Sequence, residues 1–256
     1  MRGLKGRRIV VASGAMGIGA ATATRLAAEG ARLTVGDIND AALARTVAAI
    51  DAGGGTACAV HYDLADAASI RELVAACVRS YGGIDGLVAV GADVGTATLP
   101  RDVEVTAMEV PIWERTLQVN LIGHALLMQA ALPAMVSQRD GAIVSISSAA
   151  AYHGDATMPA YSASKAGLHA LVRHVARRWG KDNIRCNAVA PGLVLTGPAR
   201  AALSEEALDE ARRQLPLPRL GEPEDIAATI AFLLSADAEW ITGQVFGVNG
   251  GHTFRE

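Results

Sequence analysis

Residues 8–19 read Arg-Ile-Val-Val-Ala-Ser-Gly-Ala-Met-Gly-Ile-Gly, a short apolar run followed by a turn of small residues. The apolar run favours a strand that is buried on both faces, and a helical stretch from Gly17 to Glu29 follows. A strand, a small-residue turn and a helix in this order place backbone N–H groups where they can bind a phosphate. The alternative is a tight connection that needs glycine only for its backbone angles.

The rest of the chain repeats this alternation of short apolar runs and longer helical stretches. The other strand candidates are residues 32–36, 56–61, 86–90, 141–147, 184–189 and 244–248. The helical stretches include residues 67–81, 115–138, 162–181 and 222–235. Alternating strands and helices imply right-handed crossovers. We therefore expect an α/β protein, a single domain over residues 1–256 with a Rossmann-like, doubly wound, seven-stranded parallel sheet.

Two stretches, residues 93–111 and 197–218, lack clear strand or core-helix character. Long connections in a compact fold are often active-site loops or lids. We expect these two segments, together with residues 149–158, to form the substrate pocket. Their Ala, Leu, Met, Val and Pro residues favour an apolar or cyclic substrate.

The composition excludes several classes of protein. The chain has 256 residues, of which 51% are hydrophobic and 19% charged, with a net charge of −3. That balance supports a sizeable core and does not indicate binding to nucleic acid or an anionic membrane. Three cysteines without a CxxC spacing argue against a disulfide framework and a metal site. With no apolar run of about 18 residues, we expect a cytoplasmic protein.

Asp37, at the end of the second strand, is the candidate selector of the cofactor. It follows Gly19 by eighteen residues, and a carboxylate there can accept hydrogen bonds from both hydroxyls of an adenosine ribose. The same charge repels a 2′-phosphate, and no Arg or Lys lies beside it. We therefore expect NAD(H) rather than NADP(H). The alternative is that Asp37 helps to cap the next helix with Asn39 and Asp40. Asp63 is expected to meet the adenine edge or to start a helix.

Tyr161 and Lys165 are four residues apart at the start of a strong helical pattern, so they share one face. A tyrosine is a poor acid or base near neutral pH because its reference pKa is about 10. A nearby ammonium favours the phenolate and lowers that pKa. The pair therefore predicts a general acid/base, and the chain keeps one of its only three lysines there. A surface contact one helical turn apart is the alternative.

Two polar residues complete the candidate site. Ser148 follows the fifth strand, at the edge of the sheet where ligands bind in open α/β folds. Ser145 and Ser147 are nearby, so position alone does not choose among the three hydroxyls. Asn120 lies among apolar residues of a predicted helix, where its amide needs a buried partner unless it is exposed.

Taken together, these residues resemble the tetrad of the short-chain dehydrogenase/reductase family, in order and in spacing. The resemblance covers nearly the whole chain, and its motifs are jointly specific. They are Trp113 with residues 119–121, Val-Asn-Leu; residues 141–148, Gly-Ala-Ile-Val-Ser-Ile-Ser-Ser; residues 161–165, Tyr-Ser-Ala-Ser-Lys; residues 184–192, Ile-Arg-Cys-Asn-Ala-Val-Ala-Pro-Gly; residues 241–243, Ile-Thr-Gly; and residues 249–251, Asn-Gly-Gly.

The resemblance implies a role for each tetrad residue. Tyr161 would exchange a proton with the substrate oxygen, and Lys165 would lower its pKa and hold the nicotinamide ribose. Ser148 would orient the carbonyl, and Asn120 would bind a relay water. The remaining expected cofactor contacts are Ser13, Met16, Gly17, Ile18 and Gly19 in the turn, Asp37, Ile38, Asp63, Leu64 and Gly91 around the adenosine, and Pro191, Gly192, Val194 and Thr196 at the nicotinamide end.

The chain departs from the family pattern at two places. The family turn is usually Thr-Gly-x-x-x-Gly-x-Gly, whereas here Ala12 and Ser13 take the first two places. Ser13 must therefore adopt the backbone angle of the first glycine, or the turn must differ. The family's Asn-Asn-Ala-Gly is replaced by residues 89–92, Ala-Val-Gly-Ala. We expect the lost asparagines to weaken a hydrogen bond that braces the sheet.

These observations favour an oxidoreductase that transfers a hydride between NAD(H) and a secondary alcohol or ketone. One alternative is a β-ketoacyl-thioester reductase acting on an acyl carrier protein; Asp37 and the acidic balance count against it. A non-catalytic nucleotide-binding scaffold is the other, and the intact tetrad counts against that. Apolar helices near Asn120 and after Tyr161 resemble the family's subunit contacts, so we expect a homotetramer or homodimer.

Overall fold

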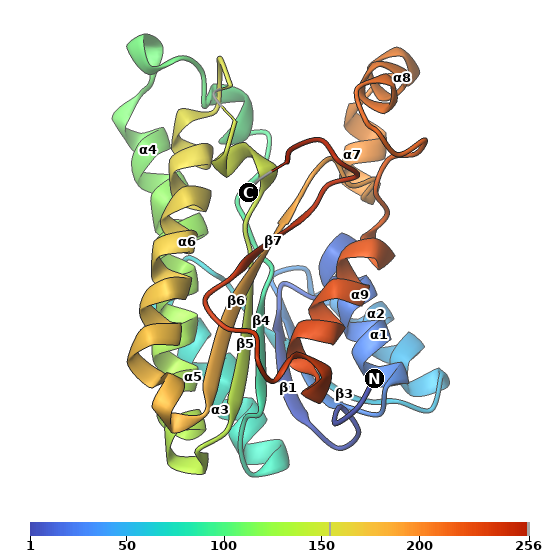
Figure 1. Cartoon of the computed structure of the whole chain (residues 1–256), viewed down its shortest axis with the longest axis vertical. Helices are drawn as coiled ribbons and strands as arrows, with labels where there is room; N and C mark the ends of the chain where they lie inside the picture. The colour runs from blue at the N-terminus through green and yellow to red at the C-terminus, as the bar shows by residue number, and fades with distance from the viewer. Residues whose placement is uncertain (154, 255–256) are drawn as a thin grey trace.

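The computed structural model describes residues 1–153 and 155–254. Gly154, inside the predicted pocket segment 149–158, and residues 255–256 lie outside the described residues. One parallel sheet of seven strands has the order β3-β2-β1-β4-β5-β6-β7, which confirms the predicted doubly wound fold (Figure 1). The strands are β1 Arg8–Ala12, β2 Arg32–Asp37, β3 Thr56–His61, β4 Gly86–Ala89, β5 Gly141–Ile146, β6 Ile184–Pro191 and β7 Val245–Val248.

Helices cover both faces of this sheet (Figure 1). One face carries α1 Gly17–Ala28, α2 Asp40–Ala52 and α9 Pro223–Leu234. The other carries α3 Ala67–Tyr81, α5 His124–Gln138 and α6 Pro159–Trp179, and α4 Val110–Leu117 packs against α6. Because the central strands are covered on both sides, their residues are mostly apolar in succession instead of alternating with polar ones.

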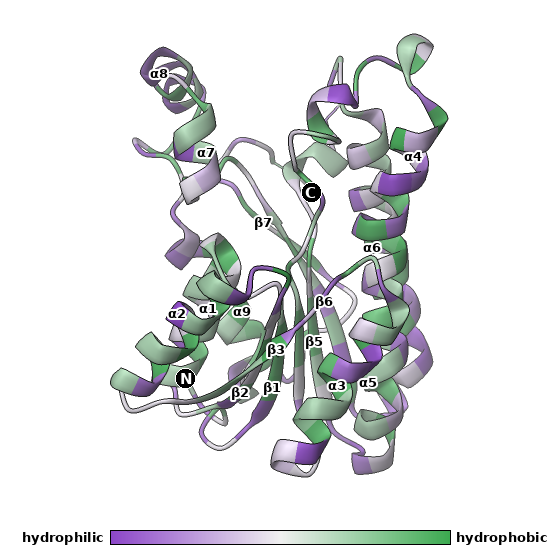
Figure 2. Ribbon diagram, turned by 180° about the vertical axis from the view of Figure 1, so that it is seen from behind, coloured by the Kyte–Doolittle hydropathy of each residue, from purple (hydrophilic) through white to green (hydrophobic). Residues whose placement is uncertain are grey.

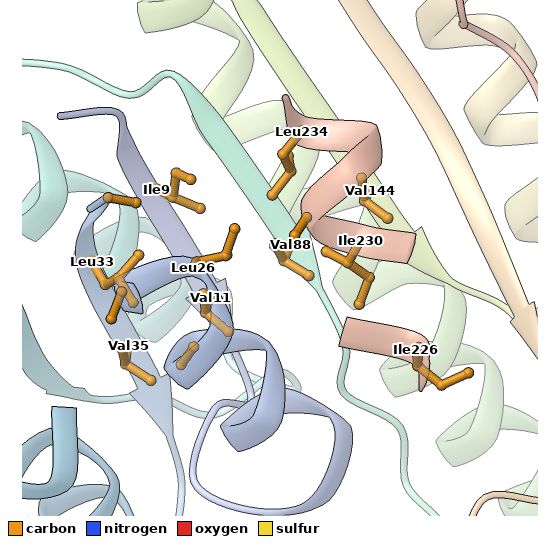
Figure 3. Close-up of a cluster of buried hydrophobic side chains, with 14 of the residues drawn as sticks. Ile9, Val11, Leu26, Leu33, Val35, Val88, Val144, Ile226, Ile230 and Leu234 are labelled. Carbon is orange, nitrogen blue, oxygen red and sulfur yellow. The ribbon is translucent and has the colours of Figure 1, made fainter. Parts of the chain in front are cut away.

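The two faces bury separate hydrophobic clusters. Ile9 and Val11 of β1 join Leu26 and Ile230 from the helices of one face, and Figure 3 shows this cluster. Val10, between them in the strand, lies in the second cluster with residues of α3, α5 and α6. Successive strand residues therefore anchor opposite helical layers, which fixes the register of the strands.

The chain order reverses beside β1, where β2 lies on one side and β4 on the other. Ligands bind beyond the carboxyl ends of the strands at such a switch point. The turn after β1 and the segment after β4 meet at this place. The fold therefore positions the small-residue turn beside the segment that departs from the family pattern.

The helix predicted over residues 115–138 is interrupted. Between α4 and α5, residues Gln118–Gly123 form a π-helical segment. Such wide turns are rare inside helices and occur often at functional sites. Here the segment carries Asn120.

The segment 197–218 contains two short helices, α7 Gly197–Ala202 and α8 Glu205–Arg213. Only Leu208 is buried in α8, whose surface is largely hydrophilic in Figure 2. This is why the sequence shows no core-helix pattern there. The other predicted loop, 93–111, holds 3₁₀ turns at Leu99–Arg101 and Val105–Ala107 before α4 begins at Val110.

The helical run Val110–Gln138, which includes α4, the π-helical segment and α5, has the length and composition to cross a membrane, with a mean hydropathy of 1.5 in its most apolar window. Half of that window is buried inside the protein. Leu127, Met128 and Ala131 belong to the core cluster shared with α3 and α6. A buried core helix explains the apolar run without a membrane.

Candidate active site

A cleft of about 550 Å³ lies beyond the carboxyl ends of the central strands. It brings together most of the residues predicted from the sequence, although they are spread over more than 180 positions of the chain. The predicted residues that line it are Ser13, Met16, Gly17, Ile18, Asp37, Ile38, Gly91, Ser148, Tyr161, Lys165, Pro191, Gly192, Val194 and Thr196.

An adjoining hollow of about 210 Å³ extends past the end of β2. Asp63 and Leu64 line it together with Ser13, Asp37 and Ile38. Gly19 and Asn120 line neither space. Gly19 supports the turn from behind, because a Cβ there would lie 1.9 Å from the carbonyl oxygen of Ser13.

Ser13 occupies the left-handed region with φ of +69°. The serine therefore adopts a backbone angle that favours glycine, one of the two outcomes predicted, at a cost of about 1 kcal/mol. Its side chain lies against Gly91, where a Cβ would come within 2.4 Å of the Ser13 hydroxyl oxygen. The small residue at position 91 thus accommodates the serine that replaces the family's glycine.

The start of α1 suits a phosphate group. Its N-cap residue, Met16, provides no side-chain hydrogen bond to the amides of the first turn. By contrast, α2 and α3 are capped by Asn39 and Asp66. Met16, Gly17 and Ile18 line the cleft, so the uncapped end of α1 faces it. Free amides and the positive end of a helix dipole bind anions, so these residues fit a pyrophosphate.

Asp37 is half-buried at the junction of the cleft and the hollow. Its carboxylate accepts hydrogen bonds from the amides of Ala15 at 2.9 Å and Asn39 at 3.0 Å. It therefore braces the turn as well as lining both spaces. Arg115 also lines the hollow, but its guanidinium is paired with Asp93 at 2.7 Å. Among the described residues that line this hollow, the one arginine is therefore already paired with a carboxylate.

Asp63 does not start a helix. Its carboxylate accepts a hydrogen bond from the amide of Ala65 at 2.8 Å, whereas Asp66 is the N-cap of α3. The helix-start interpretation of Asp63 is therefore wrong. Asp63 instead remains on the wall of the hollow.

Tyr161, Ser148 and Lys165 meet at one end of the cleft. Tyr161 lies in the first turn of α6 and hydrogen-bonds with Ser148, which follows β5. The ammonium of Lys165, one turn further along α6, donates to the carbonyl of Ile146 at 2.8 Å. It lies 5.8 Å from the centre of the Tyr161 ring. Lys165 is buried, with 1% of its surface exposed. The alternative that Tyr161 and Lys165 form only a surface contact is therefore wrong.

The protonation states differ from the prediction. Burial raises the pKa of Tyr161, and the hydrogen bond with Ser148 lowers it to a smaller extent. Burial also lowers the pKa of Lys165 to about 7. Lys165 does not contribute to the shift at Tyr161, whose causes are burial and the hydrogen bond with Ser148. The predicted lowering of the pKa of Tyr161 by Lys165 is not found, and the half-buried phenol of Tyr161 stays protonated near neutral pH.

Asn120 is fully buried in the π-helical segment, so the exposed alternative is wrong. Its carbonyl oxygen accepts a hydrogen bond from the amide of Asp93 at 2.7 Å. Its side-chain nitrogen has no protein partner among the described residues. An unpartnered buried NH₂ group is a suitable site for an ordered water.

His124 ties the segment after β4 to its surroundings. Its Nε2 atom lies 2.8 Å from the carbonyl oxygen of Gly91, and its Nδ1 atom lies 2.9 Å from the hydroxyl of Ser145. A carbonyl only accepts, so Nε2 carries the proton and Nδ1 accepts from Ser145. Burial, followed by the charge of Lys165, lowers the pKa of His124 to about 3. A neutral histidine thus braces the sheet where Ala89 and Val90 replace the family's asparagines.

Comparisons with known proteins point to one family. Residues 12–253 match the profile of a family described as Enoyl-(Acyl carrier protein) reductase. A probable short-chain type dehydrogenase/reductase of Bradyrhizobium diazoefficiens is 40% identical over 96% of this chain and 87% of its own length. A 7alpha-hydroxysteroid dehydrogenase of Bacteroides fragilis is 36% identical over 99% of this chain and 96% of its own length.

Two further matches cover nearly the whole length. A 3-oxoacyl-[acyl-carrier-protein] reductase of Thermotoga maritima is 36% identical over 97% of this chain and 98% of its own length. The crystal structure of gox2181 superposes with a TM-score of 0.90 at 30% identity, covering 97% of both chains. Sequence, fold and relatives agree: the chain belongs to the short-chain dehydrogenase/reductase family.

Proposed function

We propose that this protein transfers a hydride between NAD(H) and the alcohol or ketone carbon of a small substrate. The observation that carries the proposal is the convergence of Tyr161, Ser148 and Lys165 at one end of a cleft. The uncapped start of α1 lies in the same cleft. When bound, the dinucleotide supplies or accepts the hydride, and the protein supplies alignment and proton transfer.

In the direction of reduction, Tyr161 donates its proton to the substrate oxygen. The phenol suits this role because burial keeps it protonated and Ser148 holds its hydroxyl. Ser148 also orients the carbonyl. Lys165, with a pKa of about 7, gains and loses a proton readily near neutral pH. A water on the unpartnered amide of Asn120 would complete a path for the proton.

NAD(H) is the cofactor that the residues favour. Asp37 presents a negative charge where the adenosine ribose would lie, and Arg115 is engaged by Asp93. A 2′-phosphate would meet the carboxylate without a free cation among the residues that line the hollow.

The substrate is best described by its reacting group. Apolar residues, among them Val94, Leu193 and Pro198, line the same cleft as Tyr161. This favours an apolar alcohol or ketone. The relatives named above act on a hydroxysteroid and on a 3-oxoacyl group, which share a secondary alcohol or ketone. Reduction of a carrier-bound 3-oxoacyl group is the second candidate, favoured by the Thermotoga relative.

The test is a panel of secondary alcohols, ketones, hydroxysteroids and 3-oxoacyl thioesters, assayed by NADH absorbance with both cofactors. We expect turnover of at least one class, with kcat/KM higher for NAD(H) than for NADP(H). Absence of turnover across the panel, while NADH binds, would favour a non-catalytic role. Turnover of carrier-bound thioesters alone would favour the second candidate.

We also propose a cytoplasmic homodimer or homotetramer. Leu132, Leu171 and Trp179 line an apolar groove of about 530 Å³ between α5 and α6. Trp240 is 99% exposed in the single chain. Association of subunits would remove such apolar surface from water. A monomer by light scattering at micromolar concentration would contradict the proposed assembly.

A further inference from the structure

The helix that carries Tyr161 lacks a capping side chain of its own. Its N-cap residue is Met158, which adopts left-handed angles with φ of +63° and makes no side-chain hydrogen bond. Pro159 follows at the first helical position and has no N–H group. The first amides that need a partner are therefore those of Ala160 and Tyr161.

Asp102, from a distant part of the chain, accepts the hydrogen bonds of both amides. Its Oδ1 atom accepts a hydrogen bond from the amide of Ala160 at 3.1 Å, and its Oδ2 atom accepts one from the amide of Tyr161 at 2.7 Å. Its backbone carbonyl accepts a third from the amide of Met158 at 2.8 Å. Three hydrogen bonds from one residue thus hold the start of α6.

The carboxylate of Asp102 makes its hydrogen bonds to the start of α6. The residue is 2% exposed, and both of its carboxylate oxygens face the positive end of α6. A negative charge is favourable there because of the helix dipole. Asp102 lies in the segment 93–111, which also contains Asp93, the partner of Asn120. The cap therefore fastens this segment to the helix that carries Tyr161 and Lys165.

We propose that Asp102 is a positioning residue that sets the place of the Tyr161 phenol. The hydrogen bond at 2.7 Å reaches the backbone of Tyr161 itself. A shift of the helix start therefore shifts the phenol relative to Ser148. Misplacement of a reacting group by about 1 Å costs on the order of 100-fold in rate. This proposal rests on the proposed role of Tyr161 as proton donor.

The test compares Asp102→Ala and Asp102→Asn with the wild-type protein. We expect kcat to fall about 100-fold in Asp102→Ala, because both bonds are lost. We expect a fall of about tenfold in Asp102→Asn, because the amide oxygen still accepts one bond. The dissociation constant of NADH should stay within about threefold in both, since Asp102 does not line the cleft.

Asp85→Asn is the matched control. Asp85 is 8% exposed and likewise accepts a backbone amide, that of Arg8, but it lies at the opposite end of the sheet. We expect the Tm of this variant to be lower than that of the wild type. Its kcat, measured well below that Tm, should fall by no more than about twofold. An equal loss of kcat in Asp85→Asn, or a kcat within twofold of wild type in Asp102→Ala, would overturn the proposal.

Hydrogen exchange gives a second measurement that needs no turnover. The amides of Ala160 and Tyr161 should exchange about tenfold faster in Asp102→Ala than in the wild type. In Asp85→Asn their exchange rates should equal those of the wild type. Unchanged exchange would show that Asp102 does not hold the helix start, whatever the activity. If the wild-type protein turns over none of the substrates in the panel, the proposed function is rejected. If exchange is nevertheless faster in Asp102→Ala, the role of Asp102 in holding the start of α6 stands. If Asp102→Ala does not fold, Asp102→Asn decides both measurements.

Discussion

Tyr161→Phe is expected to lower kcat about 1,000-fold, because it removes the only hydroxyl proposed to exchange a proton with the substrate. The ring and its packing are retained, so NADH should bind with an unchanged dissociation constant. Single-turnover measurements of NADH absorbance, alongside fluorescence titration of NADH, separate the two effects. Turnover within tenfold of the wild-type rate would reject the proton role of Tyr161.

Tyr81→Phe is the control for this substitution. The Tyr81 hydroxyl donates to the carbonyl of Leu33 at 3.0 Å, near the start of β2 and therefore at the amino-terminal edge of the sheet. Its loss should cost about 1 kcal/mol of stability and leave kcat unchanged. A comparable loss of turnover in both variants would attribute the effect to destabilisation instead of chemistry.

Asp37→Asn is expected to reduce the preference for NADH over NADPH about 100-fold. Asparagine keeps an oxygen that can accept the amide of Ala15, so the turn stays braced, while the negative charge is removed. Repulsion between two charges about 6 Å apart is roughly 3 kcal/mol at an effective dielectric constant of about 20, which corresponds to about 100-fold. The measurement is the ratio of kcat/KM for the two cofactors.

Asp63→Asn removes a charge of the same sign from the same hollow. Because Asp63 is proposed to meet the adenine, which both cofactors share, the ratio should change less than about threefold. If Asp63→Asn changes the ratio as much as Asp37→Asn, the charge of the whole hollow selects the cofactor. If neither changes it, Asp37 is not the selector.

The sequence predicted the fold because both faces of the sheet are buried. Strands such as Arg8–Ala12 are continuously apolar, and the turn after β1 is the kind that a parallel sheet needs at its switch point. The pair Tyr161 and Lys165 was predicted from its local spacing, and Asn120 and Ser148 joined it through the resemblance to the family. Two residues four apart in a helix lie on the same face of that helix, whatever the rest of the protein contains.

What the sequence did not predict depends on neighbours far along the chain. The raised pKa of Tyr161 comes from burial, which no local spacing reports. His124 offers no metal-ligand spacing, and its partners Gly91 and Ser145 are more than twenty residues away. Asp102 belongs to no motif. The sequence did contain one signal. Met158 precedes Pro159 at the start of a helix, and a methionine side chain cannot accept hydrogen bonds from the first amides as Ser, Thr, Asp or Asn would. A residue from another part of the chain must therefore accept them.

The neutral histidine that braces the sheet has a consequence for tolerance of acid. In the unfolded chain, a histidine takes up a proton as the pH falls through about 6.5, whereas His124 in the folded protein does so only near pH 3. Between these values the unfolded chain binds more protons, so the folded state loses up to about 1.4 kcal/mol for each unit of acidification. Burial of this one imidazole therefore makes the folded state progressively less stable as the pH falls below about 6.5.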